Sequence, residues 1–210
     1  MSVLPVLSLG FILGMTHATD ADHVAAMSTV VAERKRLRSA AWAGALWGLG
    51  HTMMVVLVGG AIVLFRLAVP EKLALSLELG VAMMLVALGL RALLRIRHET
   101  HGHPHPAPRD GLRAVAIGLV HGLAGSAGVA LAVLSQVEGA ALGVAYLGLF
   151  GVGTMVGMAL VTALLSLPFV MASARFGRFT RRLVPLAGCA SVLLGVLLAY
   201  RICVTEGLLF

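Results

Sequence analysis

The sequence predicts an all-α protein that crosses a membrane several times. Hydrophobic residues make up 60% of the 210-residue chain and charged residues only 12%, with a mean hydropathy of +1.00. A soluble domain of this length could not keep so much apolar surface out of water, whereas a spanning helix needs about 20 mostly apolar residues. A bilayer also requires each segment to satisfy its own backbone hydrogen bonds, which favours helices. The 25 glycines suit helices that pack closely together.

Six apolar segments predict six transmembrane helices in one transmembrane domain, 1–210. The first three segments form a first half, 1–96, and the last three a second half, 112–210, separated by a His-rich loop at 97–111. No basic stretch and no small-residue cleavage site opens the chain, so we expect no removable signal peptide. The predicted helices are, in order, 3–32, 40–66, 74–96, 112–136, 141–170 and 183–204.

The distribution of basic residues predicts the orientation in the membrane. The 16 Lys and Arg residues are unevenly divided between the two sides of the predicted membrane. Thirteen lie in or beside the loops that come after the first, third and fifth segments; only Arg66, Lys72 and Arg201 lie on the opposite side. Because loops rich in Lys and Arg stay in the cytoplasm, we expect an integral protein of the cytoplasmic (inner) membrane with both termini outside. Membrane topology also accounts for the net charge of +7, so the lipid bilayer is the expected partner and nucleic acid is not.

The two halves resemble each other at two places. Residues 14–17 (Gly-Met-Thr-His) resemble residues 118–121 (Gly-Leu-Val-His), and residues 48–51 (Gly-Leu-Gly-His) resemble residues 151–154 (Gly-Val-Gly-Thr). Consecutive three-helix units have opposite orientations in the membrane. The similarity therefore predicts a 3+3 inverted repeat, in which two halves alternate access to a central site.

Ionisable residues gather in the middle of the first segment, in the run 16–23. A carboxylate at the centre of a spanning helix costs about 2.5–3.5 kcal/mol, and such residues mark ion or proton pathways by default. On a regular helix His17, Asp20 and His23 share one face, and two imidazoles with a carboxylate suit Ni, Co, Zn, Cu or Fe. Asp22 falls off that face. It ligates only if the helix is distorted; otherwise it orients a ligating His or pairs with a neighbouring helix.

Two further histidines lie at similar depth in other segments. His51 follows Gly50 in the second segment, and His121 lies in the fourth, before a run of small residues. Taken alone, a buried histidine more often bonds between helices than binds metal. Next to the first-segment cluster, both are candidate metal ligands, with a gate or a structural contact as the alternative for His121.

These motifs resemble the nickel/cobalt transporter family. Residues 17–23 match its H-x-x-x-x-D-H signature, and residues 50–52 (Gly-His-Thr) resemble its second motif, a Gly-His-Ser/Thr step in the next helix. Residues 121–128 are similar to the shorter, urease-associated members. Better-known members have eight helices with the signature in the second, whereas here it lies in the first. The carboxylate-bearing motif that those members have further along the chain is not evident.

The resemblance implies nickel or cobalt as a transported substrate rather than a cofactor. It implies metal binding by His17, Asp22 and His23, with Asp20 beside them, and proteins that mature nickel enzymes as partners. In the His-rich loop, four histidines within eight residues suit loose binding of divalent metal, during collection or receipt of the ion, unless the loop is only a polar linker. They are His98, His101, His103 and His105.

The sequence lacks the motifs of several classes of enzyme. The chain has no H-E-x-x-H, its Ser126 lies in Ala-Gly-Ser-Ala-Gly rather than in a nucleophile elbow, and no Walker-type phosphate loop occurs. We therefore do not expect an enzyme. Three alternatives stay open: a proton-coupled transporter of small ions, a metal exporter that uses the same residues, and a membrane accessory protein in nickel delivery.

Overall fold

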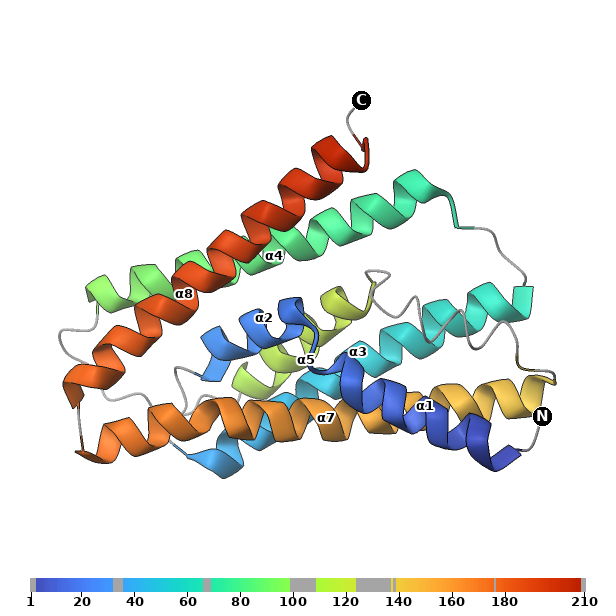
Figure 1. The fold of residues 1–210 in the computed structure, drawn as a ribbon, viewed down its shortest axis with the longest axis horizontal. Helices are drawn as coiled ribbons and strands as arrows, with labels where there is room; N and C mark the ends of the chain where they lie inside the picture. The colour runs from blue at the N-terminus through green and yellow to red at the C-terminus, as the bar shows by residue number, and fades with distance from the viewer. Residues whose placement is uncertain are drawn as a thin grey trace.

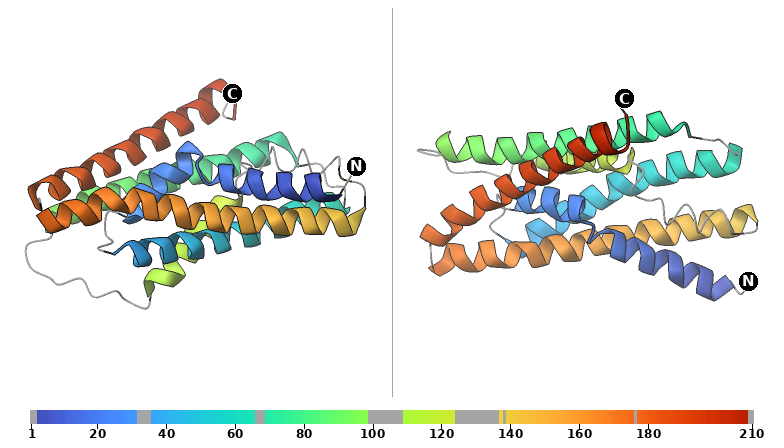
Figure 2. Two further views of the ribbon diagram at one scale, coloured as in Figure 1. Left: turned by 60° about the horizontal axis from the view of Figure 1, so that its bottom comes forward. Right: turned by 45° about the horizontal axis from the view of Figure 1, so that its top comes forward.

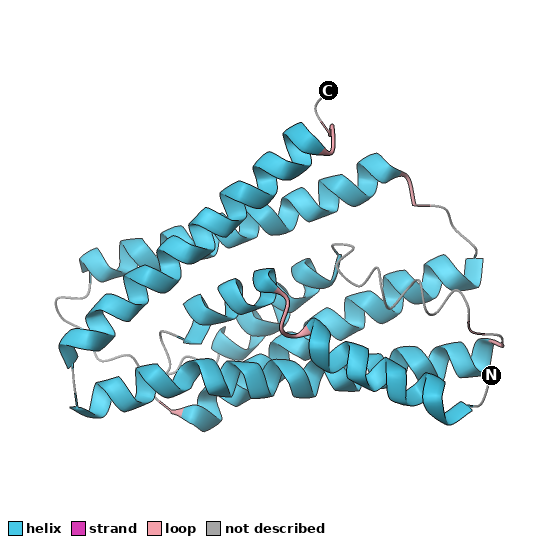
Figure 3. Cartoon of the chain, in the orientation of Figure 1, coloured by secondary structure: helices cyan, strands magenta, loops and turns pink. Residues whose placement is uncertain are grey.

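A computed structural model describes residues 3–31, 36–65, 69–98, 109–123, 137, 139–175 and 177–208. In these residues every regular element is a helix, and no strand occurs (Figure 3). The predicted all-α class is confirmed. The elements are α1 (Val3–His17), α2 (Ala21–Val31), α3 (Leu37–Phe65), α4 (Glu71–His98), α5 (Arg109–Leu123), α7 (Ala140–Arg175), α8 (Gly177–Tyr200) and the π-helical turn η2 (Arg201–Thr205).

Each predicted segment contains a helix, but the number of membrane spans differs from the prediction. Four helices of the described residues, α3, α4, α7 and α8, are long and apolar enough to cross a membrane. The bent pair α1 and α2 gives a fifth span if it counts as one. The fourth predicted segment, 112–136, is described only as far as Leu123, and its apolar helix is shorter. The structure thus has four to five candidate spans, and the sixth stays a prediction.

Large apolar side chains cover much of the outer surface. Leu4, Leu64 and Val144 are each at least 70% exposed, and the four long helices all carry other exposed Leu, Val or Met side chains. A soluble monomer rarely exposes contiguous apolar surface on this scale, whereas hydrocarbon chains solvate it without cost. The helices are therefore those of an integral membrane protein. The His-rich loop, from Glu99 to Pro108, lies outside the described residues.

The helices run in a roughly common direction and form two groups (Figures 1 and 2). In one group α1 lies along α7, and α3 packs against both α5 and α7. In the other, α4 pairs with α8. The short helix α2 contacts α4, α7 and α8 and so connects the groups. Helix α1 begins and α8 ends toward the right-hand side of the molecule in Figure 1.

Glycines allow α1 to touch α7. A Cβ atom on Gly14 of α1 would overlap the backbone of Phe150 and Thr154 in α7, and one on Gly153 of α7 would overlap the carbonyl of Phe11 in α1. Backbones approach this closely only where both helices present small residues. The two glycines therefore set the position of α1 along α7.

Helices α3 and α5 meet in the same way. A Cβ atom on Gly118 of α5 would overlap the backbone of Trp47 and His51 in α3, and one on Gly50 of α3 would overlap the carbonyl of Val115 in α5. Because Gly118 faces the backbone at His51, this contact brings α5 directly beside one of the predicted site residues.

Candidate metal centre

The first predicted span is broken at the cluster of ionisable residues. Helix α1 ends at His17 and α2 begins at Ala21, with a bend of 55° between them. The N–H of Thr19 donates to the carbonyl of Thr16 (2.9 Å), and the N–H of Asp20 donates to that of His17 (3.1 Å). Bonds of this i to i+3 kind tighten a helix end, and Thr and Asp favour helix ends over helix interiors. His17, Asp20 and His23 therefore do not share one face of a regular helix, contrary to the prediction from the sequence.

The break brings helix ends of opposite polarity to one place. His17 lies in the last turn of α1, and Asp22 lies in the first turn of α2. The carboxyl end of a helix attracts positive charge, and the amino end stabilises a carboxylate. The turn between the helices thus stabilises the Asp22 carboxylate and a cation beside His17.

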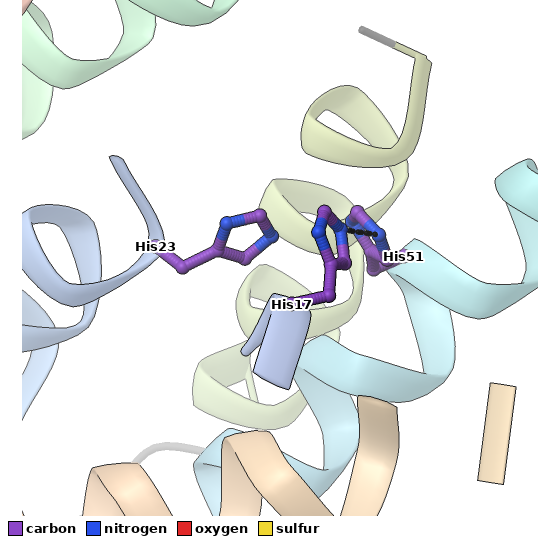
Figure 4. A group of neighbouring side chains, drawn as sticks. All are labelled: His17, His23 and His51. Atoms are coloured by element: carbon purple, nitrogen blue, oxygen red, sulfur yellow. Dashed lines mark hydrogen bonds between the residues drawn. The ribbon is translucent and has the colours of Figure 1, made fainter. Parts of the chain in front are cut away.

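Three buried imidazoles from three helices meet at the break (Figure 4). His17 of α1, His23 of α2 and His51 of α3 have ring centroids between 4.7 and 5.1 Å apart. His23 and His51 are completely buried and His17 is 7% exposed. One ring nitrogen of each lies within 4.8 Å of the others, which is a spacing that a single metal ion can bridge. We call these three residues the imidazole group.

Carboxylates orient two of the three rings. The Nδ1–H of His17 donates to Asp20 (2.8 Å), and the Nδ1–H of His23 donates to Asp22 (3.1 Å). In a neutral ring this leaves the lone pair on Nε2, which is the form that binds metal. Nε2 of His17 lies 3.1 Å from Nε2 of His51. Among the described residues, Nε2 of His23 and Nδ1 of His51 are buried and have no hydrogen-bond partner.

A second set of ligand atoms shares His23. The Nε2–H of His121, from α5, donates to the other oxygen of Asp22 (2.7 Å). The His23 and His121 rings are 4.2 Å apart, and His121 is completely buried. One ligand atom each of Asp22, His23 and His121 falls within 4.8 Å of the others. We call these three residues the carboxylate group.

All six residues selected from the sequence lie at this place, but not in the expected arrangement. Asp22, which a regular helix would turn away, bonds two imidazoles because the helix is broken before it. Asp20, expected on the ligand face, contacts His17 and belongs to neither three-residue group; its side chain is 45% exposed. Asp20 therefore lies between the buried rings and the protein surface.

Aromatic side chains enclose the centre. The indole of Trp47, 1% exposed, is stacked on His23 at 6.5 Å and lies 5.8 Å from His121. Phe150 of α7 lies 5.6 Å from His17. These rings exclude water from the imidazoles. A low local dielectric strengthens any interaction between the centre and a bound cation.

Sequence reasoning missed Glu78 of α4. Apart from Glu71 at a helix end, it is the single carboxylate within the four long candidate spans of the described residues. It is partly buried, and the charges around it include those of Glu206, Arg201 and Asp22. Arg201, the first residue of η2, forms an ion pair of 2.8 Å with Glu206, which follows η2. A lone carboxylate inside an apolar segment was the available signal.

Comparisons with known proteins agree with this centre. Residues 3–97 match the model of the NicO family, described as high-affinity nickel-transport protein. The chain is 36% identical to the urease accessory protein UreH of Bacillus sp. (strain TB-90), over 99% of this chain and 96% of that protein. It is 27% identical to the chloroplast protein FOR GROWTH AND FERTILITY 1 of Arabidopsis thaliana, over 89% of this chain and 56% of that protein.

No solved structure matches the chain. The family matched by residues 3–97 and the relative matched over nearly the whole chain are transport and accessory proteins, not enzymes, and they support metal transport or nickel delivery. The matched residues include the broken helix and three of the four buried histidines. The chain therefore belongs to the NicO family of high-affinity nickel-transport proteins.

Proposed function

We propose that this chain is a secondary-type transporter that moves Ni²⁺ or Co²⁺ across the cytoplasmic membrane through the buried His/Asp centre. The observation that carries the proposal is the convergence of His17, His23 and His51 at a broken helix inside the membrane domain. Intramembrane ionisable residues are expensive to keep, and broken helices are where transporters place ion sites. Membership of a nickel-transport family supports nickel as the first substrate to test.

The donor set suits a late first-row divalent ion. Imidazole nitrogen binds Ni, Co, Cu, Zn and Fe, and it binds the hard ions Mg²⁺ and Ca²⁺ poorly. Asp20 and Asp22 hold the rings of His17 and His23 so that the Nε2 atom of each ring is available to an ion. Such hydrogen bonds raise the affinity of the imidazoles for metal. Because copper binds such ligands more tightly than nickel, preference for nickel or cobalt depends on coordination geometry.

The matched glycine contacts support a 3+3 inverted repeat. Gly14 lies against Phe150 and Thr154, and its counterpart Gly118 lies against Trp47 and His51. Residue 118 is 104 positions after residue 14, and residues 47 and 51 are each 103 positions before 150 and 154. The contact of α1 with α7 is thus repeated by α5 with α3. A two-fold exchange of the halves produces this pairing.

The repeat also pairs the rings of the centre. His17 lies beside Phe150, and its counterpart His121 lies beside Trp47, at ring distances of 5.6 and 5.8 Å. The counterpart of His51 is Thr154, whose hydroxyl donates to the carbonyl of Phe150. We therefore propose that the second half supplies a partial copy of the ion site, with six spans in two halves and both termini outside.

Uptake of radioactive nickel by cells tests the proposal. Cells that produce the wild type should accumulate trace nickel above an empty control, and His17→Ala and Asp22→Asn should remove the excess. Depletion below the control, lost in both variants, would keep the site and make the protein an exporter. Equal nickel in wild type, variants and control would reject nickel, and the same assay with cobalt would follow.

Nickel delivery to an enzyme is the second candidate, because the relative matched over nearly the whole chain carries the name urease accessory protein. A delivery protein holds and passes on nickel through contact with maturation proteins. Purified chain in sealed vesicles separates the two functions. Flux with this protein alone supports a transporter, whereas tight binding without flux supports delivery.

A further inference from the structure

We propose that the carboxylate group is a second position for the ion, and that a transported ion passes between the two groups by exchanging one ring nitrogen of His23 for the other. This inference rests on the proposed function. The two groups comprise His17, His23 and His51 on one side, and Asp22, His23 and His121 on the other.

The orientation of His23 makes such an exchange feasible. Its Nδ1 faces Asp22 at 3.1 Å, and that carboxylate also binds His121. Its Nε2 is buried and, in the described part of the chain, has no hydrogen-bond partner. The ring centroids of His17 and His51 lie 4.7 and 5.1 Å from that of His23. The imidazole of His23 thus belongs to both groups, with one ring nitrogen directed to each. An ion can pass from one group to the other without a rotation of this ring.

The two positions offer different chemistry. The imidazole group has three neutral nitrogens, and two of the rings are already held with a lone pair on Nε2. The carboxylate group adds an anionic oxygen, but an ion can enter only if the proton on Nδ1 of His23 moves to its Nε2 and the proton on Nε2 of His121 moves to its Nδ1, so that both rings stay neutral. The imidazole group offers nitrogens that are ready to bind, and the carboxylate group offers negative charge, so neither position needs to hold the ion much more tightly than the other. Rapid conduction requires that an ion can leave each site.

Only one position can be filled at a time. Both sets need His23, and two divalent ions on opposite sides of one neutral imidazole would repel each other strongly in a buried site. We therefore expect one ion per chain, held in either of two coordination modes. Loss of one mode should leave binding intact and stop passage.

Cobalt binding to the purified full-length chain in detergent tests this inference, because the visible spectrum of Co²⁺ reports its ligands. The variants are His51→Gln, His121→Gln and the double variant. Ser191→Ala, a buried hydroxyl that donates to Leu85 between α8 and α4, is the control. Glutamine keeps the size and an N–H donor, and size-exclusion profiles show whether each variant folds.

The expected pattern has three parts. Wild type and control bind one Co²⁺ per chain and transport it in vesicles. Each single variant still binds one Co²⁺, the spectra of the two variants differ, and flux falls at least about tenfold in both. The double variant loses binding. A pattern in which folded His121→Gln keeps the wild-type spectrum and flux would overturn the second position, as would equal loss of binding in both single variants. Absence of wild-type binding and flux would instead reject the proposed function.

Discussion

The carboxylate of Asp22 lies 2.7 Å from Nε2 of His121, although 99 residues separate them in the chain. The same carboxylate accepts a hydrogen bond from His23. Asp22 therefore joins the broken helix of the first half to α5 of the second half, and it fixes two rings of the centre. Hydrogen bonds from imidazole to a carboxylate raise ligand basicity and fix the ring orientation.

Replacement of Asp22 by Asn should lower nickel affinity by about 10- to 100-fold, because a neutral amide oxygen holds the two imidazoles less firmly. Asp20→Asn is the matched comparison, since Asp20 contacts one ring and its side chain is 45% exposed. We expect a smaller loss there. Calorimetric titration of the purified variants with Ni²⁺ measures both effects. Equal affinity of Asp22→Asn and wild type would remove Asp22 from the centre.

Nickel or cobalt should quench the fluorescence of Trp47, because open-shell ions quench an indole at short range and this indole is stacked on His23. The chain has a second tryptophan, Trp42, which is 66% exposed and provides the internal comparison. Quenching should persist in Trp42→Phe and disappear in Trp47→Phe. Saturable quenching that instead follows Trp42 would place the ion elsewhere.

Alanine at Gly14 or at Gly118 should destabilise the protein by about 1–3 kcal/mol, because the added methyl group overlaps the backbone of a neighbouring helix. Gly80→Ala in α4 is the control: nothing lies within 4 Å of its Cβ position, so we expect no loss. Thermal unfolding in detergent measures the three variants. A similar cost at positions 14 and 118 supports the inverted repeat, and an undisturbed variant at either position argues against it.

Glu78→Gln should weaken uptake at low nickel concentration, with KM raised severalfold and the maximal rate little changed. The reason is that Glu78 adds negative charge near Asp22 on the partly buried face of α4. Glu71→Gln, at the exposed end of the same helix, is the control. A fall in maximal rate without a change in KM would assign Glu78 to the passage of the ion rather than to its attraction.

The sequence predicted the membrane class and the residues of the centre, because both depend on strong local signals. Long apolar segments identify helices, and a histidine or aspartate inside one is conspicuous. The four histidines outside the His-rich loop are the four that converge. The bond from His121 to Asp22 was beyond prediction, since it depends on how closely α5 approaches α3 at Gly118.

The ends of the helices and the pairing between helices were harder to predict from the sequence. The bend after His17 arises from backbone bonds of Thr19 and Asp20, and it moves Asp22 onto the ligand side against the regular-helix expectation. The sequence predicted one domain with two three-helix halves, but not how the helices of the two halves pair. In the structure α1 packs on α7 and α5 on α3, so the halves are interlocked, and moving them apart as rigid bodies would break both glycine contacts.

Nickel flux into sealed vesicles that contain only the purified chain tests the central claim most directly. Wild type should move nickel down its gradient at a saturable rate, and folded His23→Gln, which removes the ring shared by both groups, should reduce flux to that of protein-free vesicles. Ser191→Ala should match wild type. Wild-type flux that survives in His23→Gln would contradict passage through the buried centre.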